Sequence, residues 1–156
     1  GALDVHLMIE APERHIDAFA AAGADSITFH EEATAHANRT LAAIREFGCL
    51  AGIAINPGTS VEALTELRGR ADIGLCMTVN PGWGGQAFIE GSVDKVQRLA
   101  ATLGGAKVEV DGGIDAKTAK PTAEAGASLF VAGSAVFGAV DPAAAYAEIA
   151  SAAGAA

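Results

Sequence analysis

The sequence is poor in aromatic residues, basic residues, cysteine and long apolar runs, and these shortages exclude several classes of protein. Only 5% of its 156 residues are aromatic, and its formal net charge is -9. That charge excludes the basic surface that nucleic acids and anionic membranes attract. No apolar run approaches the ~18 residues of a membrane-spanning helix, and the first residues do not resemble a signal peptide. We therefore expect neither nucleic acid nor membrane among its partners.

The two cysteines, Cys49 and Cys76, form no CxxC pair and lie in different predicted elements. We interpret them as small core residues of a reducing compartment, which predicts a cytoplasmic protein. A hydrophobic fraction of 51% over 156 residues is enough for one domain with a core of its own.

A repeated unit of short apolar strand, turn and amphipathic helix organises the chain. Each unit takes roughly 25 residues, which is typical of βαβ architecture with a parallel sheet. Gly23, Gly48 and Gly126 stand where predicted helices end and a left-handed cap is expected. Lys120-Pro121 interrupts one helical pattern, and we expect the proline to confine that helix to a short preceding turn. The predicted strands are Leu3–Ile9, Ser26–His30, Ala51–Asn56, Ile73–Val79, Lys107–Asp111 and Leu129–Ala132, and the predicted helices lie near Ala11–Ala22, Ala35–Phe47, Ser60–Arg68, Ser92–Leu103, Ala116–Ala125 and Pro142–Ala153.

Glycine-rich segments follow the last three predicted strands, at residues 80–86, at Gly112-Gly113 and at Gly133-Ser134. Exposed backbone N–H groups in such loops suit an anion such as phosphate. A plain strand-to-helix turn is the simpler interpretation of any one glycine cluster. Three clusters after successive strands favour a shared phosphate site.

The placement of these glycines distinguishes two α/β architectures. An open doubly wound sheet places its phosphate glycines after the first strand, whereas a (βα)8 barrel builds its phosphate site from loops after late strands. Only six units are present, and the first predicted strand starts at residue 3. We therefore predict an α/β fold of the TIM (βα)8 type, N-terminally truncated to about six βα units, with residues 1–156 forming a single partial barrel domain.

Two predicted strands carry residues suited to chemistry. In the segment Asp4–Ile9 the alternation places Val5, Leu7 and Ile9 under helices and leaves the other side chains on the inner face. His6 is on that inner face, although a lone strand histidine is more often a satisfied core residue. Asp111 ends its strand on the inner side, which is the usual catalytic position in a barrel. A turn or N-cap aspartate is the alternative interpretation.

The segments LDVHLMIEAPERHIDAFAAAGADSITFHEEA, NPGTSVEAL, MTVNPGWGGQAFI, VEVDGGI and EAGASLFVAGSAVFG resemble the ribulose-phosphate 3-epimerase family, in order and with nearly its spacing. The resemblance implies a (βα)8 barrel that interconverts D-ribulose 5-phosphate and D-xylulose 5-phosphate by metal-assisted proton abstraction and return at C3. It also implies one divalent metal ion (zinc, iron, manganese or cobalt), a sugar-phosphate substrate and a homo-oligomer.

The resemblance also implies roles for individual residues. His6 would be a metal ligand, and Asp111 both a metal ligand and one of two acid/base groups. The remaining residues would contact substrate: Met8 and Met77 near the reacting carbons, Gly82, Trp83, Gly84 and Gly85 in a mobile loop, and Gly112, Gly113, Gly133 and Ser134 around the phosphate. Trp83 stands where the family usually has phenylalanine.

The resemblance starts at the family's third barrel strand. The family's second strand carries a histidine ligand and an aspartate that is both ligand and acid/base, and neither has a counterpart in this sequence. His30 is expected to face inward, but the resemblance gives it no ligand role, and His15 and His36 are expected to be solvated. We therefore expect the isolated 156-residue chain to be inactive. Two alternatives remain: a 3-epimerase for a six-carbon ketose phosphate, and a non-catalytic phosphosugar-binding module.

Overall fold

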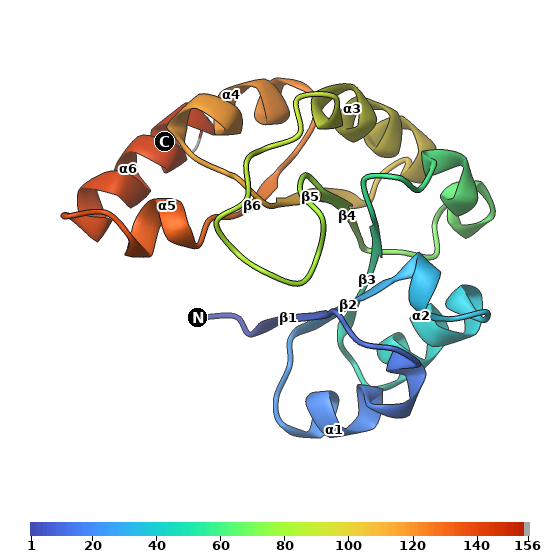
Figure 1. Cartoon of the computed structure of the whole chain (residues 1–156). Coiled ribbons are helices and arrows are strands. Elements are labelled where there is room, and N and C mark those ends of the chain that lie inside the picture. The colour runs from blue at the N-terminus through green and yellow to red at the C-terminus, as the bar shows by residue number, and fades with distance from the viewer. Residues whose placement is uncertain (155–156) are drawn as a thin grey trace.

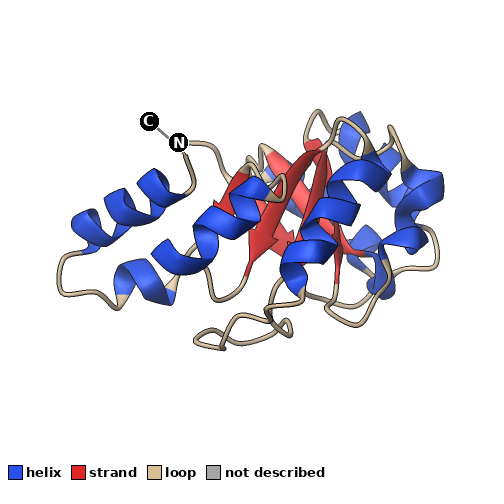
Figure 2. Ribbon diagram, turned by 90° about the horizontal axis from the view of Figure 1, so that it is seen from above, coloured by secondary structure: helices blue, strands red, loops and turns tan. Residues whose placement is uncertain are grey.

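The structure, a computed structural model, describes residues 1–154, which form one six-stranded parallel sheet whose strand order follows the chain. Figure 1 shows the sheet curving into an open arc with helices along its outer side, and Figure 2 shows helices flanking the strands from above. Within residues 1–154 the first and last strands each pair with a single neighbour. The strands are β1 (Asp4–Leu7), β2 (Ser26–His30), β3 (Leu50–Ile55), β4 (Ile73–Met77), β5 (Lys107–Asp111) and β6 (Leu129–Val131).

All six strands were predicted, and most helices lie within a few residues of their expected positions. The expected left-handed caps are confirmed, because Gly23, Gly48 and Gly126 all have positive φ. None of the helices that the structure describes is long and apolar enough to cross a membrane. The helices are η1 (Pro12–Arg14), α1 (Ile16–Ala21), η2 (Glu31–Ala33), α2 (Ala37–Glu46), η3 (Val61–Leu67), α3 (Ser92–Leu103), α4 (Ala116–Glu124), α5 (Ser134–Phe137) and α6 (Pro142–Ala152), where η marks a 3-10 helix.

Two predictions about helices were wrong. The segment expected as an α-helix near Ser60–Arg68 is the 3-10 helix η3. Pro121 does not confine its helix to a preceding turn, because α4 continues through it to Glu124. The Asp115 side chain caps α4 by accepting from the backbone N–H groups of Lys117 and Thr118. This capping box and the buried residues of α4 offset the single donor that proline removes.

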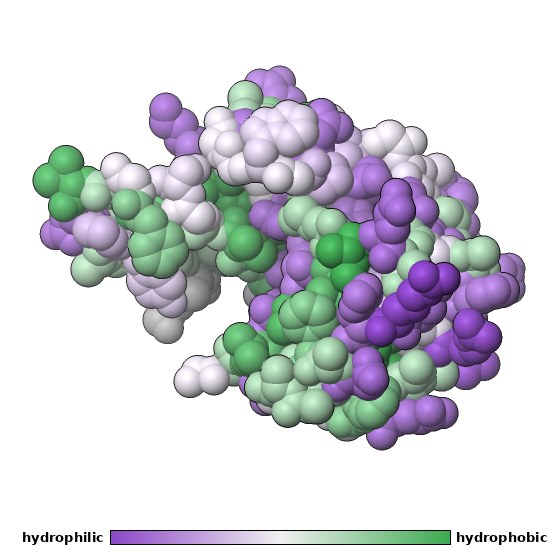
Figure 3. Space-filling model, turned by 60° about the horizontal axis from the view of Figure 1, so that its bottom comes forward, coloured by the Kyte–Doolittle hydropathy of each residue, from purple (hydrophilic) through white to green (hydrophobic). Residues whose placement is uncertain are grey.

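The arc has apolar residues on both faces, in two separate clusters. On the outer face, Leu7, Val108 and Val110 pack against the helices, as predicted. Ile9 was also expected there but is 40% exposed, because β1 ends at Leu7 and the chain turns away. The inner face carries a smaller cluster below the carboxyl ends of the strands, made of Ala54, Leu75, Met77 and Val79. Figure 3 shows a hollow between the two ends of the arc, with apolar side chains on both sides.

Candidate functional site

His6 and Asp111 meet on the inner face of the arc. His6 Nδ1 lies 3.4 Å from Asp111 Oδ2, and the two side chains are 17% and 20% exposed. They belong to β1 and β5, which three other strands separate in the sheet. Only the curvature of the arc brings these two strands face to face. Two residues predicted as partners in one site therefore lie together at the carboxyl end of the strands.

The other predicted site residues line one cavity of about 310 Å³ next to Asp111. It lies between the loops that follow β4, β5 and β6. Asp111 is the only ionisable side chain that residues 1–154 contribute to its lining. The predicted residues found there, besides Asp111, are Met8, Met77, Gly82, Trp83, Gly84, Gly85, Gly112, Gly113, Gly133 and Ser134.

The loop after β4 arches over this cavity from Asn80 to Gln86, and Figure 1 shows it in front of the arc. Gln86 closes the loop on itself, because its Nε2 donates to the carbonyl oxygens of Asn80 at 2.6 Å and Trp83 at 2.9 Å. Trp83 is 65% exposed, so its ring rests on little else. The loop is therefore a self-contained flap that starts and ends at fixed strand and helix ends.

Close packing of the backbone against Val79 and Phe88 explains the glycine pair after β5. Gly113 has a φ of +64°, and a Cβ there would lie 2.7 Å from the backbone nitrogen of Phe88. Gly112 has a φ of +118°, and a Cβ there would lie 2.3 Å from Val79 Cγ2. Both conformations favour glycine, and both positions exclude a side chain. The Gly112-Gly113 turn is thus packed directly against the segment that closes the flap.

A second cavity of about 300 Å³ adjoins the first and shares Met8, Pro81 and Gly82 with it. His30 and Glu32 line it, and His30 is 5% exposed, as expected for an inward-facing residue. His15 and His36 are exposed, also as expected. Burial raises the pKa of Glu32, but hydrogen bonds from His30, Thr59 and the backbone N–H of Asn56 lower it by more, to about 2.

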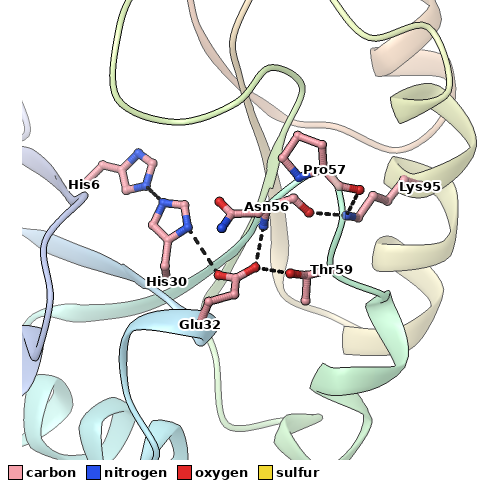
Figure 4. Close-up of polar contacts among 7 residues, drawn as sticks. All are labelled: His6, His30, Glu32, Asn56, Pro57, Thr59 and Lys95. Atoms are coloured by element: carbon pink, nitrogen blue, oxygen red, sulfur yellow. Dashed lines mark hydrogen bonds and ion pairs between the residues drawn. The ribbon is translucent and has the colours of Figure 1, made fainter.

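Sequence reasoning missed the polar network that begins at His30, which Figure 4 shows. Glu32, Asn56 and Thr59 belong to it, together with the buried Lys95 of α3. A usable signal was present, because FHEEA and INPGT span the carboxyl ends of the neighbouring strands β2 and β3 and the residues just after them. Residues at the carboxyl ends of paired parallel strands lie at the same edge of a sheet.

Glu109 lies on the inner face together with Asp4 and Asp111. It is two residues before Asp111 in β5 and is 3% exposed. Burial raises its pKa to about 8, and the negative charges of Asp4 and Asp111 act in the same direction. Asp4 itself accepts a hydrogen bond from Ser26 Oγ. The interior of the arc is therefore acidic below the rim that carries His6 and Asp111.

His6 and Asp111 fit two positions of a metal site. An imidazole nitrogen and a carboxylate oxygen converge there, and both are donors that zinc and other divalent transition metals accept. Among residues 1–154, however, no group of three or more His, Cys, Asp or Glu side chains is arranged to hold a metal ion. The described residues thus supply a ligand pair and not a complete coordination sphere.

The fold places the chain in the class of parallel βα-barrel proteins. The structure superposes on the crystal structure of 3-hexulose-6-phosphate synthase with a TM-score of 0.69 and 25% identity, over 92% of this chain and 69% of that one. It also superposes on the crystal structure of KGPDC from Streptococcus mutans with a TM-score of 0.71 and 20% identity, over 93% of this chain and 68% of that one. The second likeness shows the fold alone.

Sequence comparison identifies the family. The family model "Ribulose-phosphate 3 epimerase family" matches residues 1–137, and the chain belongs to this family. It is 49% identical over 152 residues to ribulose-phosphate 3-epimerase of Bacillus subtilis (94% of this chain, 70% of the relative). It is 48% identical over 147 residues to ribulose-phosphate 3-epimerase 2 of Cupriavidus necator (89% of this chain, 61% of the relative). The match to this second relative therefore spans about three fifths of its length.

Proposed function

We propose that this chain forms the lid, the phosphate-binding loops and part of the metal site of a ribulose-phosphate 3-epimerase, which interconverts D-ribulose 5-phosphate and D-xylulose 5-phosphate. The observation that carries the proposal is the 3.4 Å approach of His6 Nδ1 to Asp111 Oδ2 beside a cavity edged by three glycine-rich loops. Family membership and the names of the two relatives support it.

A divalent metal ion (zinc, iron, manganese or cobalt) belongs to the proposal. His6 and Asp111 would hold it, with its other ligands supplied from outside this pair. When bound, such an ion supplies Lewis-acid polarisation of the substrate carbonyl beside C3. The protein's own contribution is to fix the two donor atoms at the rim of the arc.

Asp111 would act on one face of the substrate, removing the C3 proton there in one direction of the reaction and delivering a proton to that face in the reverse direction. Inversion at a carbon needs a second acid/base group on the opposite face. Since Asp111 is the only ionisable residue of the described chain that lines the cavity, we propose that the second group lies outside residues 1–154. Residues 1–156 alone would then not epimerise.

The glycine-rich loops would bind the substrate phosphate. Within residues 1–154 the backbone N–H of Gly113 donates to no protein acceptor, which leaves it available to an anion. Gly133 and Ser134 lie on the same cavity wall. Met8 and Met77 would supply apolar contact to the sugar, while the flap that carries Trp83 would exclude water.

Neither alternative is favoured. The two relatives described above are both named ribulose-phosphate 3-epimerases. These names support a five-carbon substrate over a six-carbon ketose phosphate. The paired donor atoms of His6 and Asp111 support an enzyme over a non-catalytic module. We also propose a homo-oligomer and a cytoplasmic location. The two buried free cysteines, Cys49 and Cys76, are consistent with the location.

The test is proton NMR of D-ribulose 5-phosphate in D₂O with the natural protein that contains these 156 residues. We expect xylulose 5-phosphate to form with deuterium at C3. Asp111→Asn should slow both conversion and deuterium uptake by roughly 10²–10⁴-fold, the usual contribution of an acid/base group. Asp115→Asn is the matched control, because asparagine also caps a helix. Equal rates in the two variants would overturn the proposal.

A further inference from the structure

Four side chains form a line that runs away from the predicted metal site. Asp111 Oδ2 lies 3.4 Å from His6 Nδ1, His6 Nε2 lies 2.8 Å from His30 Nε2, and His30 Nδ1 lies 3.4 Å from Glu32 Oε2. The two imidazole planes differ by only 14°, and their centroids are 4.9 Å apart. Because the nitrogens are much closer than the centroids, the rings meet edge to edge, as Figure 4 shows.

Glu32 is held in place at the far end of this line. The backbone N–H of Asn56 donates to Glu32 Oε1 at 2.8 Å, and Thr59 Oγ1 donates to the same oxygen. The Nζ atom of Lys95 fixes that loop by donating to the carbonyl oxygens of Asn56 and Pro57. One carboxylate oxygen is therefore occupied by two donors, and the other faces His30.

A cation bound between His6 Nδ1 and Asp111 would fix where the ring hydrogens lie. Ionised carboxylates only accept, so the cation would take the place of a hydrogen at His6 Nδ1, while His30 Nδ1 would keep the hydrogen that points to Glu32. A neutral His30 then has a lone pair on Nε2 and accepts from His6 Nε2–H. His6 Nδ1 is left with a lone pair facing the Asp111 carboxylate, and such an arrangement suits a cation bound to both atoms.

We propose that Glu32 and His30 are positioning residues that act through His6: they hold its ring in the orientation and tautomer that present Nδ1 to a divalent cation at Asp111. This inference rests on the proposed function, because it takes His6 and Asp111 as ligands. His30 touches neither the cation nor the substrate in this arrangement. Its role is to accept from one imidazole and to donate to one carboxylate.

Glu32→Gln reverses the line with almost no change of shape. The glutamine oxygen must stay with Asn56 N–H and Thr59 Oγ1, because its NH₂ group cannot accept from them. The NH₂ group then donates to His30 Nδ1, so His30 carries its hydrogen on Nε2 and donates to His6. His6 in turn carries its hydrogen on Nδ1, the atom that should bind the cation.

The experiment detects these hydrogens by NMR. It uses the natural protein that contains these 156 residues, labelled with ¹⁵N-histidine and titrated with Zn²⁺. Long-range proton–nitrogen spectra distinguish the two tautomers of each ring, and the His6 signals report Zn²⁺ affinity at this site alone. We expect His30 in the Nδ1–H form and Zn²⁺-bound His6 in the Nε2–H form. In Glu32→Gln the His30 tautomer should reverse, and Zn²⁺ affinity should fall roughly 10- to 100-fold, as for other outer partners of metal ligands.

Glu31→Gln is the matched control, because Glu31 is the adjacent glutamate and lies outside the line. In this variant the tautomers of His6 and His30 should stay as in the unmodified protein. Its Zn²⁺ affinity should stay within about twofold, because Glu31 lies outside the line. If Zn²⁺ binds His6 equally in Glu31→Gln and Glu32→Gln, or His30 is in the Nε2–H form in the Zn²⁺-bound unmodified protein, the inference is overturned while the proposed metal site stands. If Zn²⁺ leaves His6 unchanged in the unmodified protein, the proposed metal site and the inference fall together.

Discussion

The two ends of the arc position the candidate site by different means. At the β1–β3 end, side chains hold side chains, and the line from His6 through His30 ends on Glu32. At the β4–β6 end, the backbone of the Gly112-Gly113 turn packs directly on the side chain of Val79 and on the backbone of Phe88. The first end can be altered one hydrogen bond at a time, whereas the second resists any added atom. The difference separates the residues that tune the site from those that shape it.

The largest effect should come from adding one methyl group to the backbone-packed end. In Gly113→Ala the new Cβ would meet backbone at 2.7 Å and also force a positive φ on alanine. We expect the free energy of unfolding to fall by about 2–4 kcal/mol, measured by urea denaturation. Gly69→Ala separates the two causes, because Gly69 has a similar φ of +72° but nothing within 4 Å of the added Cβ. An equal loss in both variants would show that close packing plays no part.

A smaller effect should follow at the other end from Lys95→Met, which removes the ammonium group and keeps most of the length of the side chain. Lys95 is 6% exposed and donates to the carbonyl oxygens of Asn56 and Pro57. Its removal leaves two part-buried carbonyl oxygens without this donor, which costs about 1 kcal/mol, the low end of the range for a lost hydrogen-bond partner. Lys120→Met, at an exposed position, should change the free energy of unfolding by less than about 0.5 kcal/mol. Thermal unfolding of both variants under one buffer condition checks this difference.

The smallest expected effect is a pH dependence of the free energy of unfolding that comes from the adjacent residues Glu31 and Glu32. The pKa of Glu32 is lowered to about 2, so its contribution to stability is present above the ordinary value of 4.5 and is lost as the pH falls toward 2. The pKa of Glu31 is raised by burial and then by the charge of Glu32, so its contribution is present below pH 4.5 and is lost as the pH rises through the raised value.

Urea denaturation between pH 2 and pH 7 should therefore give stability differences of opposite slope for Glu32→Gln and Glu31→Gln, each measured against the unmodified protein. Glu32→Gln should lose stability as the pH rises, and Glu31→Gln should gain it. High salt should weaken only the part of the Glu31→Gln slope that comes from the charge of Glu32, because salt screens charges and does not remove burial or hydrogen bonds. Parallel slopes would mean that the hydrogen bonds to Glu32 do not hold it ionised.

Much of the backbone-packed end was predictable from the sequence, and little of the hydrogen-bonded end was. Glycine pairs after apolar runs mark turns directly, so the amino-acid order alone places Gly112, Gly113 and Gly133 in turns. Asp111 and His6 followed from strand alternation together with family resemblance. The contact between them, however, depends on the curvature of the whole sheet, which no local pattern encodes.

The missed residues share one property, which is that their partners are distant in the chain. Glu32 is 24 residues from Asn56, and Lys95 is 39 residues from Asn56. A lysine within the apolar stripe of a helix or a glutamate after a strand suggests a solvated residue until the neighbouring loop is known. The error at Pro121 has the opposite origin: a strong local rule was overridden by the capping of α4 by Asp115 and by its packing.

The agreement between strand order and chain order has a consequence for how the protein folds. Every strand of the sheet pairs only with the strands next to it in the sequence, so each pairing closes a loop of one helical unit. The entropy lost on closing such loops is small and nearly equal for all five pairings. Folding can therefore advance unit by unit along the chain as it emerges during synthesis. The contact between His6 and Asp111, which spans most of the sheet, would then form only after β5 has paired.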